Sequence, residues 1–302
     1  MSAEFAYIDL LRSLATHPGA RGLADDAAVI ELGSETLILT HDSIAEGMHV
    51  RCGTDPADIA WKLIATNLSD LAAKGAAPLG VLTAHALGEP DWDAAFVEGL
   101  RAVLETYDVP LLGGDTIRLP DGAARVFGCT AIGRATCSPV PARSGAKPGD
   151  ALWVTGAIGD AFAGFTLIEA GGAVPDSLAA AYLRPVPLLF EGRALAPLVH
   201  AMMDVSDGLL LDAARMAEAS GMTVRIDSAR VPISAAARAA IPDRLDEALR
   251  WGDDYALLFA APTDFEAPTA AARIGDFIAV TGAALLLDGR PLEPGDAGGY
   301  RH

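Results

Sequence analysis

The apolar residues in the first half of the chain recur with the periods of both helices and strands. Helical spacing predicts a short amphipathic helix over residues 4–16 and a second helix that Asp55 caps and Pro56 starts, running through residue 75. Two apolar runs, 27–32 and 36–40, flank Gly33-Ser34 and predict a β-hairpin. The other elements predicted here are strands at 78–87, 110–114 and 124–133, and a helix capped by Asp91 that ends near Tyr107.

The segment 137–150, CSPVPARSGAKPGD, holds three prolines and two glycines and predicts a linker. We therefore expect an N-terminal domain over 1–137 and a C-terminal domain over 138–302. Strands and helices alternate in both halves, which predicts α/β or α+β layers. The second half is expected to contain strands at 151–156, 201–205, 223–227 and 255–260, helices at 160–170 and within 176–198, a helix over 207–219 that Ser206 caps, and a terminal hairpin at 277–289.

Composition narrows the classes of partner. A chain of 302 residues that is 51% apolar is large enough for two domains with substantial cores. Its 40 acidic and 22 basic residues give a net charge of −18. Nucleic acids and anionic membranes bind clustered Lys and Arg, so the charge argues against both kinds of partner.

The sequence also indicates a compartment. Three cysteines without a C-x-x-C pair indicate a reducing environment and no disulfide framework or zinc site. The first residues, MSAEFAYIDLLRSLATH, lack the basic and apolar regions of a signal peptide. No stretch approaches the roughly 20 apolar residues of a membrane span. We expect a cytoplasmic protein that is not inserted in a membrane.

Aspartates recur where predicted strands begin or end, which is where α/β proteins place ligand sites. Taken singly, each of them has the alternative role of a turn or cap residue. The positions concerned are Asp25-Asp26, Asp42, Asp115, Asp204, Asp207 and Asp253-Asp254.

Asp70 differs from these because it falls in the middle of a predicted helix, on one face with Leu63 and Asn67. A carboxylate on an apolar face needs a partner, and Lys74, one turn further on, is a candidate. Carboxylate sites without thiols select hard cations, and Mg²⁺ binds to a few carboxylates together with substrate phosphates. The pattern therefore suggests phosphate chemistry bridged by metal ions.

The common nucleotide motifs are absent: the sequence has no G-x-x-x-x-G-K-[ST], no G-x-G-x-x-G and no kinase catalytic loop. A G-x-S-x-G nucleophile elbow is absent as well. Candidate direct contacts to phosphate are Arg143, Lys147 and the backbone amides of GGDT at 113–116.

Seven segments in this order resemble the thiamine-monophosphate kinase family over nearly the whole chain. They are ADDAAVI (24–30), THDSIAEGMH (40–49), NLSDLAAKGAAP (67–78), GGDT (113–116), RSGAKPGD (143–150), DVSDGL (204–209) and GDDYAL (252–257). The family belongs to the aminoimidazole ribonucleotide synthetase-like superfamily. The resemblance implies an N-terminal α/β domain that dimerises through its sheet, a C-terminal α+β domain, and ATP in the cleft between them.

The resemblance further implies transfer of the γ-phosphoryl group of ATP to thiamine monophosphate, in a cytoplasmic homodimer that uses several Mg²⁺ ions. It assigns metal binding to Asp26, Thr40, Asp42, Asp70, Asp115, Asp204 and Asp207. It assigns ATP binding to Gly114, Asp115, Arg143 and Ser206, and substrate binding to His49, Asp253 and Tyr300.

Three positions depart from the pattern of the family. Ala24 replaces a glycine, His41 replaces a hydroxyl residue, and Asp253 is one methylene shorter than the usual glutamate. Two alternatives stay open: another ATP-dependent enzyme of the superfamily, or a protein that binds nucleotide or thiamine phosphate without turnover. The selenophosphate synthetase type would need a reactive cysteine before Cys52, and the hydrogenase-maturation type a cysteine at the C-terminus.

Overall fold

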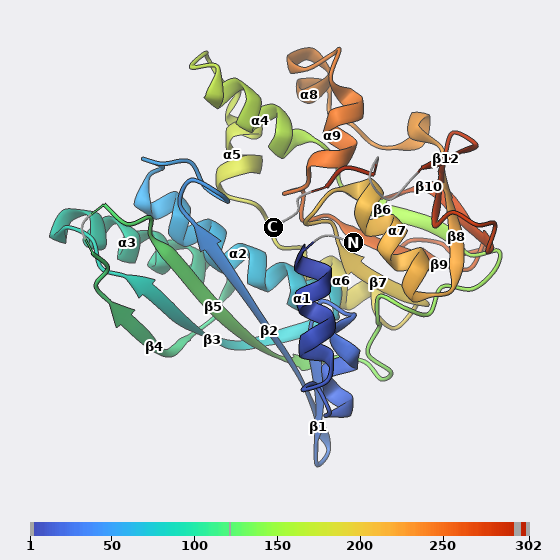
Figure 1. The fold of residues 1–302 in the computed structure, drawn as a ribbon, viewed down its shortest axis with the longest axis horizontal. Coiled ribbons are helices and arrows are strands. Elements are labelled where there is room, and N and C mark those ends of the chain that lie inside the picture. Colours follow the sequence, from blue (N-terminus) through green and yellow to red (C-terminus); the bar gives the residue numbers. More distant parts are fainter. Residues whose placement is uncertain (1–2, 121, 293–296, 300–302) are drawn as a thin grey trace.

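Two mixed β-sheets, one from each half of the chain, organise the molecule (Figure 1). The structure is a computed structural model that describes residues 3–120, 122–292 and 297–299. A short helix α1 (Ala3–Arg12) and a 3₁₀ turn η1 (Pro18–Leu23) precede the first sheet. In the described residues, none of the helices is both long enough and apolar enough to cross a membrane.

The first sheet has the strand order β1-β2-β5-β3-β4, in which only β3 and β4 are parallel neighbours. The predicted hairpin is confirmed as β1 and β2, joined at Gly33, whose φ of 65° suits a tight turn. The strands are β1 (Ala28–Leu32), β2 (Glu35–Ala45), β3 (Ala76–Ala86), β4 (Leu111–Ile117) and β5 (Val126–Ala135).

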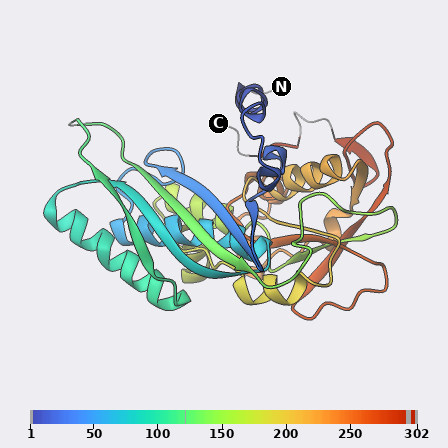
Figure 2. The same ribbon diagram turned by 90° about the horizontal axis from the view of Figure 1, so that it is seen from below.

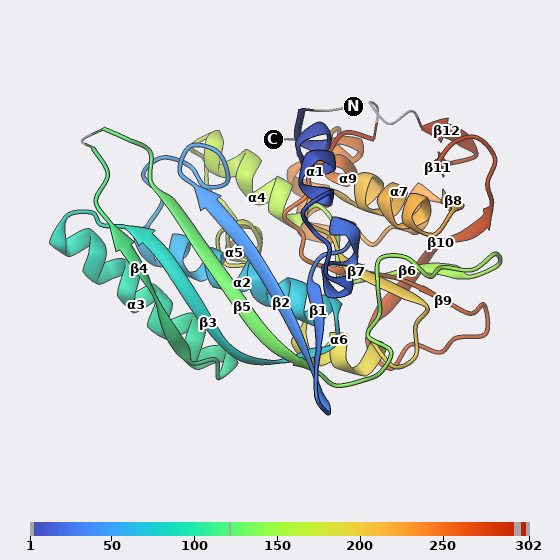
Figure 3. The ribbon, with the colours of Figure 1, turned by 60° about the horizontal axis from the view of Figure 1, so that its bottom comes forward.

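Helices α2 (Pro56–Ala73) and α3 (Pro90–Tyr107) pack on one face of this sheet (Figure 2). Figure 3 looks onto its other face, where the strands lie in front of both helices. Asp91 does not cap α3, contrary to the prediction: Glu89 holds the N-cap position without a side-chain bond, and Asp93 accepts from the amide of Gly88 at 2.6 Å. The proline at the first helical position starts this helix two residues earlier than a cap at Asp91 would.

Helix α2 is the centre of the molecule, since it contacts the first sheet on one side and the second half of the chain on the other. Asp55 caps it as predicted, accepting from the amide of Ala57 at 2.8 Å. It approaches α6 (Leu189–Leu195) so closely that a Cβ on Gly192 would lie 2.0 Å from the carbonyl oxygen of Ala72. The burial of α2 on both sides makes its polar residues candidates for internal contacts.

The second sheet has the order β12-β11-β8-β10-β6-β9-β7, with β8 and β11 as its parallel pair. All strands of the first sheet precede residue 136 and all strands of the second follow residue 150, whereas the exact domain division at 137/138 stays a prediction. The strands are β6 (Ala151–Thr155), β7 (Ala201–Asp204), β8 (Met222–Ile226), β9 (Leu257–Ala261), β10 (Ala271–Ala279), β11 (Leu285–Leu287) and β12 (Arg290–Leu292).

Of the helices in the second half, the one over 209–219 contacts β7, β8 and β11, whereas those over 160–169, 176–183 and 235–240 pack on one another (Figure 1). The predicted terminal hairpin at 277–289 is wrong, because β10 pairs with β6 and β8 whereas β11 pairs with β8 and β12. The hairpin that forms is β11–β12, which turns at Asp288 and Gly289, both with positive φ. The remaining helical elements are α4 (Asp160–Glu169), α5 (Asp176–Leu183), α7 (Leu209–Ala219), η2 (Ser228–Arg230), α8 (Ala235–Ala240) and α9 (Leu245–Trp251).

Candidate active site

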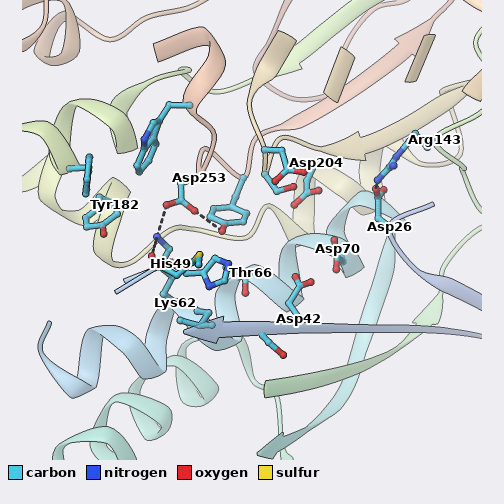
Figure 4. A pocket seen from close by; sticks show the side chains of 18 residues that line it. Asp26, Asp42, His49, Lys62, Thr66, Asp70, Arg143, Tyr182, Asp204 and Asp253 are labelled. Atoms are coloured by element: carbon cyan, nitrogen blue, oxygen red, sulfur yellow. Dashed lines mark hydrogen bonds and ion pairs between the residues drawn. The ribbon is translucent and has the colours of Figure 1, made fainter. Parts of the chain in front are cut away.

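A cavity of about 660 Å³ lies between the two halves of the chain (Figure 4). Its size is that of a site for a small molecule. Residues that the sequence predicted for metal, nucleotide and substrate gather here. The lining residues are Asp26, Asp42, Ser43, Ile44, Met48, His49, Lys62, Thr66 and Asp70 from the first half, and Arg143, Phe165, Tyr182, Asp204, Ser206, Asp207, Trp251, Asp253 and Tyr255 from the second.

Helix α2 supplies three polar side chains at a spacing of four residues: Lys62, Thr66 and Asp70. That spacing places them in one row along the face of the helix that borders the cavity. At a rise of 1.5 Å per residue, the row from Lys62 to Asp70 extends about 12 Å along the helix axis. One helix therefore borders the cavity from one end to the other.

Asp70 is buried and accepts a hydrogen bond from the hydroxyl of Thr40 on β2. Burial raises its pKa well above the ordinary value, and the charges of Asp42, Asp204 and Asp26 raise it further. Asp42 is held above the helix because its backbone amide donates to Asn67 Oδ1 at 3.0 Å. These carboxylates lie close enough to repel one another.

Lys74 does not pair with Asp70, contrary to the prediction. It follows the end of α2, and its ammonium contacts Asp25 Oδ1 at 2.5 Å and Asp26 Oδ2 at 2.7 Å. Burial alone would raise the pKa of Asp26, but Lys74 and Arg143 lower it to about 2. Arg143 donates to the other oxygen of Asp26, so this end of the cavity holds paired charges.

Asp204 is the last residue of β7, and Asp207 lies in the turn between β7 and α7. Asp204 accepts from the hydroxyl of Ser69 on α2 at 2.6 Å, and burial together with the charge of Asp26 raises its pKa to about 8. Asp207 pairs with Arg215 on α7. Both of these carboxylates reach the cavity from the second half of the chain.

Ser206 does not cap α7, contrary to the prediction. The helix begins at Leu209, and Asp212 inside it accepts from the backbone amides of Ser206 and Asp207 at 3.1 and 3.0 Å. Asp212 thus fixes the turn from within the helix and leaves the hydroxyl of Ser206 available to the cavity. Burial and the charge of Asp207 raise the pKa of Asp212 to about 7.

The segment 252–255 lies against the turn after β7. The amide of Asp253 donates to the carbonyl of Ser206, and that of Tyr255 to Val205, both at 2.8 Å. Gly252 allows this approach, since its φ is 98° and a Cβ would lie 2.3 Å from the oxygen of Ser206. The backbone therefore joins two of the seven segments that carried the resemblance.

The other end of the cavity combines charges with aromatic rings. Asp253 Oδ2 lies 2.6 Å from Lys62 Nζ, and Asp253 Oδ1 accepts from the hydroxyl of Tyr255 at 2.9 Å (Figure 4). Lys62 Nζ also lies 4.4 Å from the ring centre of Tyr182. His49 borders the same region and its Nδ1 accepts from the amide of Ala45 at 3.0 Å.

Three aromatic side chains form the wall beyond Lys62. The ring centres of Phe165 and Trp251 are 5.0 Å apart, and those of Phe165 and Tyr182 are 5.4 Å apart. Such a wall suits a flat or cationic ring. We did not predict this wall or the role of Lys62 from the sequence, although the spacing Lys62–Thr66–Asp70 is a signal that places Lys62 beside Asp70.

Several predicted residues lie elsewhere. Gly114 and Asp115 are on the exposed edge strand β4, paired with Thr83 and Ala84, and do not line the cavity. Lys147, a candidate phosphate contact, lies 2.9 Å from His200 Nε2 and does not line it either. Tyr300 lies outside the described residues.

The donor set of the cavity fits a hard divalent cation. Six aspartates line it together with the hydroxyls of Ser43, Thr66 and Ser206, and no thiol does. Among the described residues, no three acidic, histidine or cysteine side chains already converge as a complete metal site. The raised pKa values of Asp70 and Asp204 indicate uncompensated charge, which a cation brought in with phosphate oxygens would offset.

Comparisons with known proteins agree with this geometry. Residues 24–135 match the family described as AIR synthase related protein, N-terminal domain, and residues 147–276 match its C-terminal domain. The thiamine-monophosphate kinase of Escherichia coli O157:H7 is 39% identical over 80% of this chain and 76% of its own length. That of Caulobacter vibrioides is 36% identical over 98% and 90%. The structure of AaThiL complexed with AMPPCP and TMP superposes with a TM-score of 0.89 at 28% identity, covering 99% of this chain and 96% of that one.

Proposed function

The chain belongs to the thiamine-monophosphate kinase family of the AIR synthase related proteins, and we propose that it transfers the γ-phosphoryl group of ATP to thiamine monophosphate. The resemblance seen in the sequence is thereby confirmed, and so is the fold that it implied. The products are thiamine diphosphate and ADP.

The observation that carries this proposal is the order of groups along the cavity (Figure 4). Arg143 and Asp26 lie at one end, the carboxylates of Asp42, Asp70 and Asp204 lie in the middle, and the group around Lys62 lies at the other end. This order supports a nucleotide at the first end, an acceptor with an aromatic ring at the second, and the transferred phosphoryl group over the carboxylates.

The chemistry needs positioning and charge neutralisation rather than a protein nucleophile. Bound Mg²⁺ would neutralise the phosphate charges between the two ligands. We propose Asp26, Asp42, Asp70, Asp204 and Asp207 as its ligands, and Thr40 as a residue that orients Asp70 through its hydrogen bond. The acceptor phosphate is already ionised, so a strong general base is unnecessary.

The ligand contacts follow the same order. We propose Arg143 and Ser206 for ATP, and His49 and Asp253 for thiamine monophosphate, with support from their places in the cavity. Tyr300 stays a proposed substrate contact on the strength of the sequence alone.

We also propose a homodimer that pairs the face of the first sheet opposite to α2 and α3. Four large apolar side chains on its strands are 39–54% exposed: Leu82, Leu112, Ile117 and Val126. Such a patch is typical of an interface. Gly114 and Asp115 stay proposed nucleotide and metal contacts on the strength of the sequence alone. A cytoplasmic location is supported by the three cysteines, which are all free thiols.

The experiment is product formation from ATP and thiamine monophosphate, with and without Mg²⁺, and with thiamine as a control acceptor. Thiamine diphosphate formed only from the monophosphate and only with metal is the expected result. Binding of both ligands without product would contradict an enzyme and indicate a binding protein. Failure to bind thiamine monophosphate, with ATP still bound, would indicate another substrate of the superfamily.

A further inference from the structure

Lys62 is a buried cation whose ammonium contacts the carboxylate of Asp253 at 2.6 Å and donates to the carbonyl oxygen of His49 at 3.5 Å. Its side chain is 3% exposed, whereas that of Asp253, its partner, is 22% exposed. A buried ammonium is costly to leave without a counter-charge. Lys62 can therefore leave Asp253 only if an anion enters to replace it.

Asp253, in contrast, does not depend on Lys62 for its position. Its second oxygen accepts from Tyr255, and its backbone amide donates to Ser206. Its carboxylate would stay in place if Lys62 moved away. It would then offer a free negative charge beside the wall formed by Phe165, Tyr182 and Trp251.

The acceptor of the proposed reaction carries both charges that such an exchange needs: a phosphate and a cationic thiazolium ring. The ammonium of Lys62 lies between Asp253 and the ring of Tyr182, so in the ligand-free protein it occupies the position that suits the ring cation. It also begins the row that leads to Asp70, and so faces the region where phosphates would gather.

Resting on the proposed function, we propose that Lys62 selects a phosphorylated acceptor by exchanging ion-pair partners. When thiamine monophosphate binds, Lys62 leaves Asp253 and donates to the acceptor phosphate, and the ring cation takes its place between Asp253 and the aromatic wall. Thiamine has the ring cation but no phosphate. It must displace Lys62 without giving it a new partner, and it therefore binds weakly.

The test is the dissociation constant of thiamine monophosphate and of thiamine, measured by calorimetry on the full-length protein. In the wild type the monophosphate should bind at least about 10-fold more tightly, since a hydrogen bond between charged groups contributes about that much. In Lys62→Met the monophosphate should bind at least about 10-fold more weakly, and thiamine should bind as well as before or better. The preference for phosphate then disappears.

Three further variants separate this role from a structural one. Lys62→Arg keeps the charge and should retain the preference for the monophosphate over thiamine. It therefore tests the role of the charge even if Lys62→Met fails to fold. Asp253→Asn should weaken thiamine more than the monophosphate, since it removes the contact to the ring from both ligands but also leaves Lys62 without its carboxylate partner, which favours entry of the phosphate. Arg184→Met is a matched control: Arg184 also pairs with a carboxylate, that of Asp58, and lies over an aromatic ring, that of Trp61, but it does not line the cavity.

Equal losses for both ligands in Lys62→Met would overturn the proposal, as would an unchanged affinity for the monophosphate. If the wild type forms thiamine diphosphate and Lys62→Met gives either of these two results, only the role of Lys62 is refuted and the proposed reaction stands. A wild type that binds the monophosphate no better than thiamine also refutes that role. A wild type that forms no thiamine diphosphate, yet loses the phosphate preference in Lys62→Met, refutes only the proposed reaction.

Discussion

Replacement of Asp204 by asparagine should abolish turnover and yet stabilise the metal-free protein. Asp204 is buried beside other carboxylates, and its pKa rises from 3.8 to about 8. Because the pKa of this acid is higher in the folded than in the unfolded chain, the folded state binds the proton more tightly. The protonated Asp204 therefore contributes its full stabilisation at a pH below about 4, the pKa in the unfolded chain. This stabilisation is lost as the pH rises from about 4 through about 8, the pKa in the folded protein.

The magnitude follows from the two pKa values. One pKa unit corresponds to about 1.4 kcal/mol, so Asp204 alone should lower the free energy of unfolding by about 2 kcal/mol between pH 6 and pH 8. Asparagine keeps the shape and the contact to Ser69 but cannot ionise. At pH 8, Asp204→Asn should therefore be more stable than the wild type by about 2 to 5 kcal/mol, a large part of the total stability of a domain.

The assay is urea unfolding followed by circular dichroism, with EDTA present, at pH 6, 7 and 8. The difference between Asp204→Asn and the wild type should grow with pH. Asp264→Asn, which changes an exposed carboxylate, is the control and should show no such growth. A variant no more stable than the wild type at pH 8, or a difference independent of pH, would refute the reasoning. Mg²⁺ with an ATP analogue should stabilise the wild type more than the variant.

Three further predictions concern the same region. Asp70→Asn should lower turnover by at least about 100-fold in a steady-state assay, because it removes a charge that faces the phosphates; a rate close to that of the wild type would remove Asp70 from the proposed metal ligands. Gly252→Ala should lower the free energy of unfolding in urea by about 1 to 3 kcal/mol more than Gly282→Ala. Both glycines have positive φ, but only a Cβ at Gly252 would lie against Ser206, so equal losses would mean that φ alone matters. Asp212→Ala should raise the KM for ATP at least about 10-fold, because the backbone amides of Ser206 and Asp207 lose the carboxylate that accepts their hydrogen bonds. An unchanged KM would show that this turn keeps its conformation without Asp212.

The local pattern of the sequence predicted the elements that depend on local chemistry. Asp55 and Pro56 start α2, and Gly33 turns the first hairpin, because a cap and a turn are decided within a few residues. The predicted terminal hairpin was wrong because strand pairing is not decided within a few residues. The apolar residues of β10 predict a strand, but nothing in them specifies that β8 and β6 are its neighbours.

The residues of the site likewise fall into those that the local sequence predicts and those that depend on contacts between distant elements. The position of carboxylates at strand ends predicted five of the six aspartates that line the cavity, since a charge next to an apolar run needs a ligand or a partner. Lys74 failed as the partner of Asp70 because the helix ends there and its side chain reaches a loop far away in sequence. Asp212 and Tyr182 were missed because their roles depend on how α7 and α5 approach the cavity.

The central position of α2 has a consequence for how the site opens. Lys62, Thr66 and Asp70 are parts of one rigid helix, so their separations cannot change when the two halves of the chain move apart. Asp204, Asp207 and Asp253 belong to the other half and are tied to one another by backbone hydrogen bonds. A motion of one half relative to the other would therefore move Asp204, Asp207 and Asp253 as one group away from α2, and the acceptor side would lose its contact between Lys62 and Asp253 in the same step.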